Sequence, residues 1–199
     1  MKKELAPEWA LLGLLTQKPM HGYELHRYFT DPSALGKVWY LGLSQMYKLL
    51  RELEGQGHLE ATLEEQENYP DRKVYHITPS GRAAFSQWME KPVRNIRLIR
   101  VEFLAKLFLA QLLWPEMIER VISTQLEACQ AHLTRLQERM ESGEWRVENG
   151  DGRGDAAKDF KHLVYRFRQG QIQAIIDWLK TCRGVFLGGG QETLPNGER

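Results

Sequence analysis

The chain has few of the residues that mark secreted or membrane proteins. Its 199 residues include only two cysteines, Cys129 and Cys182. That number is too small for a disulfide framework, so we expect a reduced, cytoplasmic setting. The most apolar stretch, residues 98–114, is interrupted by three charged residues, whereas a membrane-spanning helix needs about 20 mostly apolar residues. A disulfide-stapled secreted domain and a transmembrane protein are therefore not expected.

Motifs for metal binding, nucleotide binding and catalysis are also missing. Cys129 and His132 form a CxxH pair, but no second pair supplies the remaining ligands that zinc requires. His21 and His26 are five residues apart, so they do not share a helical face, and HExxH, Walker A and Rossmann glycine patterns do not occur. Cys129 lies in an apolar seam, where a small inert residue is expected. The sequence predicts no metal site, no cofactor and no enzymatic activity.

The charge of the chain is balanced, with a formal net charge of +1. A clearly basic domain is the usual mark of nucleic-acid binding, and this chain lacks it. The local distribution differs from the total, because residues 35–51 contain Lys37, Lys48 and Arg51 and no acidic residue. Any DNA interface must therefore depend on where the charges lie.

Apolar periodicity divides the start of the chain into three short helices, predicted at about residues 7–16, 23–29 and 44–56. Ser44 is the predicted N-cap of the third helix, because its hydroxyl can accept a hydrogen bond from an unpaired amide of the first turn. One face of this helix carries an apolar stripe of leucines and one methionine, which is predicted to be buried. The opposite face is therefore expected to point to solvent. The stripe consists of Met46, Leu49, Leu50 and Leu53, and the outward residues are Gln45, Lys48, Arg51 and Glu52, with Tyr47 at the border.

A hairpin and a fourth helix complete this part of the chain. Alternating apolar runs around residues 59–63 and 74–78 predict a two-stranded hairpin, whose polar tip at residues 66–72 is expected to project into solvent. The fourth helix is predicted to begin near Pro79 and to end before Pro92. Three helices, a hairpin and a helix in this order predict a winged helix-turn-helix domain at residues 1–92.

The third helix is the candidate DNA reader, since a single helix fits the major groove, where glutamine pairs with adenine and lysine with guanine. The hairpin adds Arg72 and Lys73, which are placed to reach phosphates. We assign the acidic residues Glu64, Glu65 and Glu67 to the opposite side of the wing, since they would repel the DNA backbone. The contacts predicted on the helix are Ser44, Gln45, Tyr47, Lys48 and Arg51.

Each of these residues also has a plainer interpretation. An exposed glutamine or lysine on a helix is usually only solvated. A tyrosine at the edge of an apolar stripe, such as Tyr47, is more often a packing residue with a hydrated hydroxyl.

From Asn95 onward the pattern is purely helical, and residues 93–183 are predicted to form an antiparallel helical dimerisation domain, followed by a flexible tail at residues 184–199. One apolar helix is predicted from Leu98 to Leu113, and a loop rich in glycine and aspartate at residues 142–156 separates two further helices with seams of coiled-coil spacing. These seams can pair within one subunit, between subunits, or both. The predicted dimerisation residues are Ile118, Ile122, Leu126, Leu133 and Leu136 in the first seam and Phe160, Val164, Phe167 and Trp178 in the second.

Three segments resemble the PadR family of bacterial regulators. They are HGYEL at residues 21–25, LSQMYKLLRELEGQGHLE at residues 43–60 and RKVYHITPSGR at residues 72–82. They occur in the correct order and cover the first ninety residues, while the rest of the chain is similar in pattern to the helical C-terminal domain of the longer members.

The resemblance implies a cytoplasmic transcriptional regulator, usually a repressor, that dimerises through its C-terminal helices and inserts the third helix of each subunit into successive major grooves. Many relatives have a small residue or proline where this chain has Lys48, so the operator sequence does not carry over. By the family pattern, DNA contact carries over to Tyr23, Ser44, Gln45, Tyr47, Lys48, Arg72 and Lys73.

Family members often release DNA on binding an aromatic or drug-like ligand, so a small-molecule effector is a further implied partner. Trp39, Trp114 and Trp178 are the aromatic candidates for such a pocket. Simple packing is the expectation for each, because tryptophans on apolar helix faces usually fill the core.

Two hypotheses follow from these patterns. The leading one is a homodimer that binds a pseudo-palindromic operator, with half-sites about one helical turn, or a multiple of it, apart. The alternative is a winged-helix protein-interaction module without sequence-specific DNA binding, which the acidic wing and the near-neutral charge favour.

Overall fold

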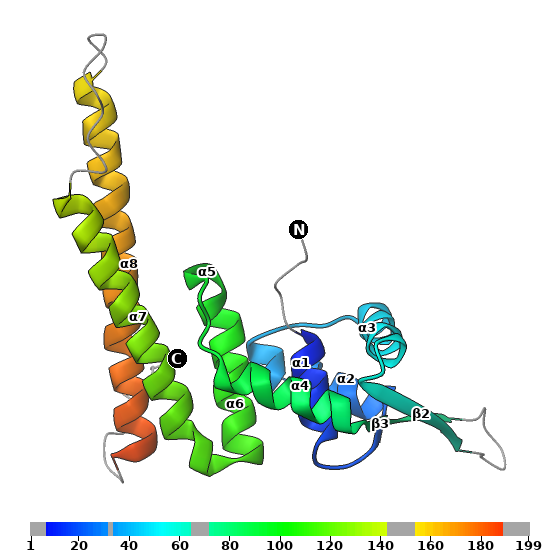
Figure 1. Ribbon diagram of the computed structural model, residues 1–199. Helices are drawn as coiled ribbons and strands as arrows, with labels where there is room; N and C mark the ends of the chain where they lie inside the picture. Colours follow the sequence, from blue (N-terminus) through cyan, green and yellow to red (C-terminus); the bar gives the residue numbers. More distant parts are fainter. Residues whose placement is uncertain (1–6, 32–33, 65–71, 143–153, 189–199) are drawn as a thin grey trace, which may run out of the picture. The chain divides into compact units, whose positions relative to one another are not determined.

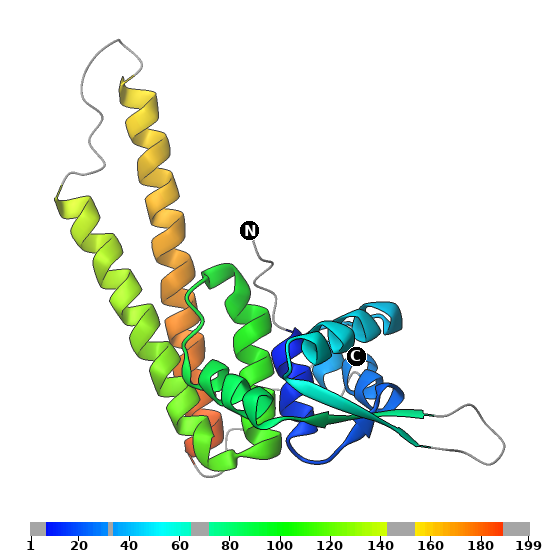
Figure 2. The ribbon, with the colours of Figure 1, turned by 45° about the vertical axis from the view of Figure 1, so that its right-hand side comes forward.

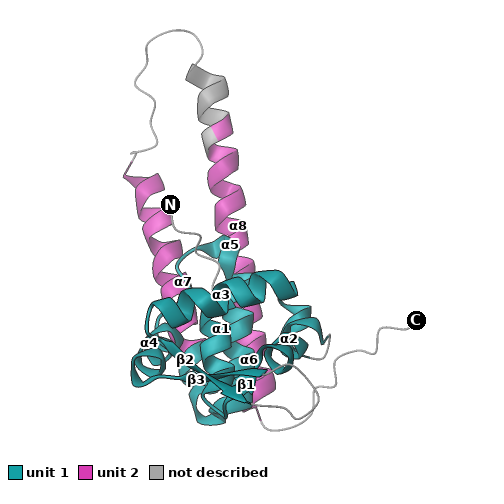
Figure 3. Cartoon of the chain, turned by 90° about the vertical axis from the view of Figure 1, so that its right-hand side faces the viewer, with its two compact units in different colours: residues 1–121 teal, residues 122–199 magenta. Residues whose placement is uncertain are grey.

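The computed structural model of the protein describes residues 7–31, 34–64, 72–142 and 154–188. The chain divides into two compact units, residues 1–121 and 122–199 (Figure 3). In the first unit, three helices, a hairpin and a fourth helix follow one another (Figure 1), which confirms the predicted order. These elements are α1 (Pro7–Leu15), α2 (Gly22–Thr30), α3 (Leu43–Gly55), β2 (Leu59–Glu64), β3 (Arg72–Ile77) and α4 (Pro79–Glu90), with a short 3-10 turn, η1 (Leu35–Lys37), before α3.

Helix α1 is the centre of this unit. Five of its nine residues are apolar side chains with at most 1% exposure, and the helix contacts α3, α4 and β3. Gly13 lets α4 approach closely, because a Cβ there would lie 2.7 Å from the ring of Phe85. A helix that is apolar on every side needs neighbours on every side. The later helix α6 (Leu104–Leu113) supplies one of them.

The sheet has one strand more than the sequence indicates. β2 and β3 pair antiparallel, with Leu59 opposite Ile77 and Glu64 opposite Arg72, and the hairpin extends beyond the helices (Figure 2). The two-residue strand β1 (Met20–His21) pairs with the other edge of β3, which gives the order β1-β3-β2. Two residues are too few to show an alternating pattern, so periodicity could not predict β1. The predicted polar tip lies, apart from Arg72, outside the described residues.

The segment after α4 is helical but not uniform. The sequence predicts one helix from Leu98 to Leu113, whereas the structure has α5 (Ile96–Leu98), a π-helical turn η2 (Ile99–Phe103) and then α6. This segment belongs to the first unit, which extends to Val121, because α6 packs against α1.

A buried lysine lies where this segment meets the end of α4. Lys106 of α6 is 2% exposed. Its ammonium lies 3.5 Å from a carboxylate oxygen of Glu102, donates to the carbonyl of Lys91 and lies 4.6 Å from the centre of the Trp88 ring. The Trp88 indole N–H donates to the same carboxylate at 2.9 Å. Burial lowers the pKa of Lys106 to about 8, although the charge of Glu102 raises it.

The second unit is a pair of long helices, of which α7 begins four residues before the boundary. A 3-10 turn, η3 (Pro115–Met117), leads into α7 (Ile118–Glu141), and α8 (Gly154–Leu187) lies antiparallel beside it (Figures 1 and 2). Their proximity is also evident at His132 of α7, whose pKa is lowered by burial and by the positive charges of Arg135 and of Arg168 on α8. None of the described helices combines the length and apolar character needed to cross a membrane.

Two predicted segments fall mainly on residues that the structure does not describe. Most of the predicted loop, residues 143–153, lies outside the described residues, and α8 begins at Gly154, inside the stretch predicted as loop. At the other end, α8 continues to Leu187, past residue 184, where the flexible tail is predicted to begin. Residues 189–199 lie outside the described residues.

The buried charge of Lys106 gives the folded protein a defined pH dependence. Lys106→Met keeps a long side chain and removes the ammonium. Below a pH of about 8 the wild type carries the full cost of burying the charge, and this cost disappears as the pH rises from about 8 towards 10.5, the ordinary pKa of lysine. The free energy of unfolding of the wild type should therefore rise relative to that of the variant by about 2 kcal/mol between about pH 7.5 and about pH 9.5. Denaturant titrations of both proteins measure the difference, and parallel pH profiles would contradict it.

Candidate DNA-binding surface

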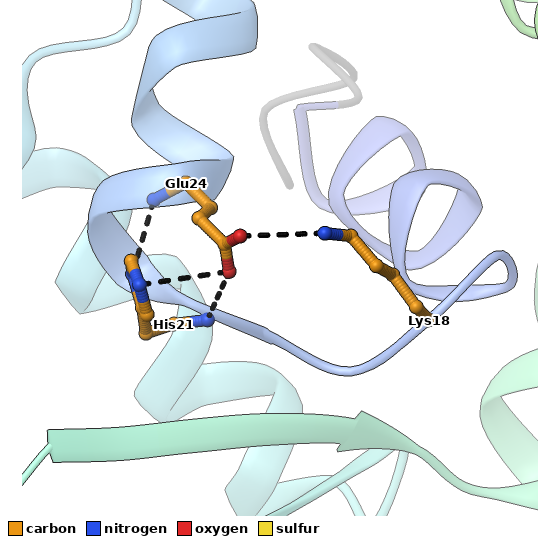
Figure 4. A network of polar contacts seen from close by, with 3 residues as sticks. All are labelled: Lys18, His21 and Glu24. Carbon is orange, nitrogen blue, oxygen red and sulfur yellow. Dashed lines mark hydrogen bonds and ion pairs between the residues drawn. The ribbon is translucent and has the colours of Figure 1, made fainter.

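The HGYEL segment forms the start of α2 through a reciprocal cap (Figure 4). The Nδ1 atom of His21 accepts from the backbone N–H of Glu24 at 3.3 Å, and the carboxylate of Glu24 accepts from the backbone N–H of His21 at 3.3 Å. The ammonium of Lys18 lies 3.4 Å from the other carboxylate oxygen. Partial burial raises the pKa of Glu24, but these bonds and charges outweigh it and hold the pKa below 4.5. The first turn of α2 is thereby fixed, and it carries Tyr23, which is 64% exposed.

Tyr47 connects α3 to α2. Its side chain is half-buried, and a Cβ at Gly22 would lie 2.6 Å from the Tyr47 ring and 2.8 Å from its hydroxyl oxygen. The ring therefore packs directly on the backbone of α2, which requires a glycine in the HGYEL segment. The packing interpretation of Tyr47 fits this geometry, while its contact with DNA stays a prediction.

Helix α3 presents a polar face. The side chains of Ser44, Gln45, Lys48 and Arg51 are exposed, while Met46, Leu50 and Leu53 are buried. Leu49, also predicted in the buried stripe, is only half-buried. The predicted cap was wrong: α3 begins at Leu43, its N-cap is Gly42, and no side chain caps it. Because the N-cap lies two residues earlier than expected, Ser44 lies in the first turn, and its exposed side chain belongs to the polar face.

Two of the predicted DNA-contacting cations are paired with carboxylates of α3. The ammonium of Lys48 lies 3.9 Å from Glu52, and that of Lys73 lies 2.8 and 3.1 Å from the two carboxylate oxygens of Glu54. The hydrogen bond to Glu54 is the main cause of a raised pKa for Lys73. Both pairs are partly exposed, and such pairs contribute roughly 0–1 kcal/mol. Lys73 thus links the base of the wing to α3.

The remaining two arginines of the predicted surface are exposed. Within the part of the chain that the structure describes, neither Arg51 nor Arg72 is in an ion pair. The wing acid Glu64 is exposed and pairs with Arg72 in the hairpin register. Directly paired residues of an antiparallel hairpin share one face, so Glu64 lies on the same face as Arg72 and its assignment to the opposite side from Arg72 was wrong. Glu65 and Glu67 lie outside the described residues, so their predicted orientation stays a prediction.

One aromatic residue beside α3 was missed by the sequence analysis. Tyr40 lies three residues before the start of the helix and is 73% exposed, more than Tyr23. An exposed tyrosine next to a helix with a polar face can add a hydroxyl donor to that surface. An aromatic residue shortly before the predicted third helix was the signal that could have identified it.

The three tryptophans proposed for an effector pocket have different surroundings. Trp114 packs on Phe85 with ring centres 5.3 Å apart, as the packing interpretation expects. Trp39 is half-buried next to η1, and Trp178 is partly exposed on α8. No metal-binding cluster of three or more histidine, cysteine or acidic residues occurs among the described residues. Cys129 is buried and accepts from the Gln125 amide at 3.5 Å, and burial raises the pKa of its thiol.

The close approach of Gly22 and Tyr47 can be tested by substitution. Gly22→Ala places a methyl group inside contact distance of the ring, so we expect overpacking to lower the free energy of unfolding by about 1–3 kcal/mol. Gly55→Ala is the matched control, because a Cβ there meets nothing within 4 Å, and it should leave stability unchanged or raise it by up to about 1 kcal/mol. Denaturant unfolding measures both. Equal stability of the two variants would show that the packing of the Tyr47 ring does not require a glycine at position 22.

Two family models match the chain. Residues 11–87 match the Transcriptional regulator PadR-like family, and residues 99–186 match Virulence activator alpha C-term. The chain is 25% identical over 180 residues to the Negative transcriptional regulator PadR of Bacillus subtilis, covering 90% of this chain and 96% of that protein. It is 36% identical over 88 residues to a probable transcriptional regulator of Mycobacterium tuberculosis, covering 44% of this chain and 46% of that protein.

Solved structures of such regulators are also similar. Bacillus subtilis PadR in complex with operator DNA is 24% identical, with a TM-score of 0.45, covering 92% of this chain and 99% of that one. The same protein in complex with p-coumaric acid is 24% identical, with a TM-score of 0.38, covering 94% and 98%. Together the two matched segments cover most of the chain, residues 11–87 and 99–186. The chain belongs to the PadR-like family of transcriptional regulators, which are not enzymes.

Proposed function

We propose that this regulator is a homodimeric repressor that binds a pseudo-palindromic operator through α3 of each subunit. The observation that carries the proposal is the exposed polar face of α3, where Gln45, Lys48 and Arg51 lie together on a helix anchored by its buried stripe. Glutamine, lysine and arginine are side chains that read base edges in the major groove. We propose repression because the similar Bacillus subtilis protein is named a negative transcriptional regulator. A regulator that acts on bacterial DNA works in the cytoplasm.

The wing and α2 supply contacts to the DNA backbone in this proposal. Arg72 at the start of β3 reaches a phosphate, and the exposed hydroxyls of Tyr23 and Tyr40 donate to others. Lys48 and Lys73 leave their carboxylates when DNA arrives, since partly exposed pairs hold them only weakly. The proposed DNA-binding domain remains residues 1–92, with contacts at Tyr23, Ser44, Gln45, Tyr47, Lys48, Arg51, Arg72 and Lys73, to which Tyr40 is added.

Dimerisation is supported by α8, which has two apolar faces. One face is buried within the chain and includes Tyr165, Ile172 and Ile176. The opposite face, here called the outer stripe, is apolar and exposed, and its members Phe160, Leu163 and Phe167 are 65–68% exposed. A contiguous exposed apolar strip on a helix marks an interaction surface. The outer stripe consists of Phe160, Leu163, Phe167, Ala174, Trp178 and Val185.

A second copy of the chain is the simplest partner for the outer stripe, because a two-fold axis pairs the same stripe with itself. The other predicted dimerisation residues have less apolar surface to offer. Ile118, Ile122 and Leu136 are already buried within one chain, and Leu126, Leu133 and Val164 are half-buried. A two-fold dimer also explains why the operator should be pseudo-palindromic. Release from DNA by a small ligand completes the proposal, since a similar structure carries p-coumaric acid.

Reversal of one charge on the reader helix tests the DNA contact. Lys48→Glu should weaken binding to a duplex from the region upstream of the protein's own gene by at least about 100-fold and reduce the salt dependence. Lys180→Glu is the matched control, because Lys180 is also exposed and paired with an acid on its own helix, at 3.8 Å. Fluorescence anisotropy across a salt series, with a scrambled duplex for comparison, measures both. Equal, weak binding of the wild type to both duplexes would favour a protein-interaction module.

Oligomeric state tests the outer stripe. Phe167→Asp places a charge at the centre of the stripe, so we expect a folded monomer where the wild type is a dimer, as measured by size-exclusion chromatography with light scattering. Arg166→Asp changes the charge on the side of the same helix and should leave the dimer intact. A monomeric wild type, or a dimeric Phe167→Asp variant, would contradict the proposed interface.

A further inference from the structure

A cavity of about 410 Å³ lies within the first unit, at the end of α4. It is lined by α1, by the segment that follows α4 and by η2, all of which belong to that unit. Two tryptophans, two carboxylates and two basic side chains belong to its lining. The lining includes Glu8, Trp9, Trp88, Arg94, Leu98 and Glu102.

The charge of Glu102 is already compensated. Its carboxylate accepts from the Trp88 indole at 2.9 Å and lies 3.5 Å from the buried ammonium of Lys106. The Trp88 ring holds that same ammonium 4.6 Å from its centre, so one cation already rests on this aromatic surface. Glu102 and Trp88 therefore form a fixed wall.

Glu8 is different. It lies in the first turn of α1, it is only partly exposed, and no cation pairs with it among the described residues. Burial is the main cause of its raised pKa, which the negative charges of Glu52 and Glu102 raise further, while its own backbone N–H lowers it. A carboxylate that is partly removed from water and faces other carboxylates gains stability from a bound cation.

Two basic residues of the lining repel a positively charged ligand. Lys91 and Arg94 are exposed, so water and salt screen their charges, whereas the carboxylate of Glu8 is less accessible to solvent. Trp9 is half-buried and adds a second aromatic surface beside Glu8 in the sequence. Aromatic faces attract organic cations, with about 0.5–2 kcal/mol per contact. The balance at this cavity favours a positive ligand.

We propose that this cavity binds a small organic cation with an aromatic body, whose ammonium group pairs with Glu8 and whose ring packs against Trp9 and Trp88. The ligand thereby bridges α1, the central helix of the DNA-binding unit, and the end of α4. The binding site stands on its own observations. Its use as a regulatory site, at which the ligand changes affinity for DNA, rests on the proposed function.

Isothermal titration calorimetry of the full-length protein without DNA tests the site. The probes are 2-phenylethylamine, 2-phenylethanol and phenylacetate, which share one ring and a short chain but differ in charge. We expect one amine to bind per chain, at least about tenfold more tightly than the alcohol, with the carboxylate weakest. Glu8→Gln should reduce amine affinity to about that of the alcohol and leave the alcohol unchanged. Glu127→Gln, an exposed acid on α7, is the control and should change neither.

Equal affinity for the three probes, no binding of the amine, or unchanged amine binding by a folded Glu8→Gln variant would each overturn the site. Circular dichroism and thermal unfolding verify that the variants fold. Addition of the amine to the duplex titration then tests regulation separately. If the amine binds but duplex affinity does not change, the site stands and its regulatory role is wrong. If the protein does not bind DNA at all, the calorimetry still decides the site.

Discussion

The burial of α1 on every side is the constraint on which the rest of the first unit depends. A nine-residue helix with so little polar surface cannot remain exposed, so α3, α4, β3 and α6 all pack against it. Gly13 sets the distance of this packing, because it leaves room for the ring of Phe85. The polar face of α3 is a consequence of this arrangement, since its apolar stripe is committed to the core. The α4 end and the α1 start meet at the aromatic cavity for the same reason.

In the proposed DNA-binding surface, the local placement of charge matters more than the net charge of the chain, which is +1. Lys48 of α3 and Lys73 of the wing are held by weak, partly exposed pairs with Glu52 and Glu54. Such pairs keep the free surface close to neutral and are easily exchanged for phosphates. Lys73 has a second role in the free protein, because its pair with Glu54 links the base of the wing to the reader helix. The acidic residues near the interface are therefore compatible with DNA binding.

The apolar pattern of α8 has a different consequence. Its buried face is covered inside one chain, while the outer stripe on the opposite face is exposed. Periodicity in the sequence predicts a seam through Phe160, Val164, Phe167 and Trp178, of which all but the half-buried Val164 lie on the exposed face. A pattern of spacing identifies an apolar face but does not say what covers it. A helix of the same chain and a helix of a second subunit can cover such a face equally well. The outer stripe is for that reason the natural place to look for the dimer.

The sequence by itself determined the order of elements in the first unit, the buried stripe of α3 and the family, because these depend on local periodicity, turn residues and short motifs. It did not show β1, whose two residues form a strand only because β3 lies beside them. Nor did it show the N-cap at Gly42, the packing of Tyr47 on Gly22, the exposure of Tyr40 or the pair between Lys73 and Glu54. Apart from the N-cap, which is local to α3, each of these joins or exposes residues through the way different elements pack. Only tertiary structure decides such contacts, since they depend on which faces the core leaves free.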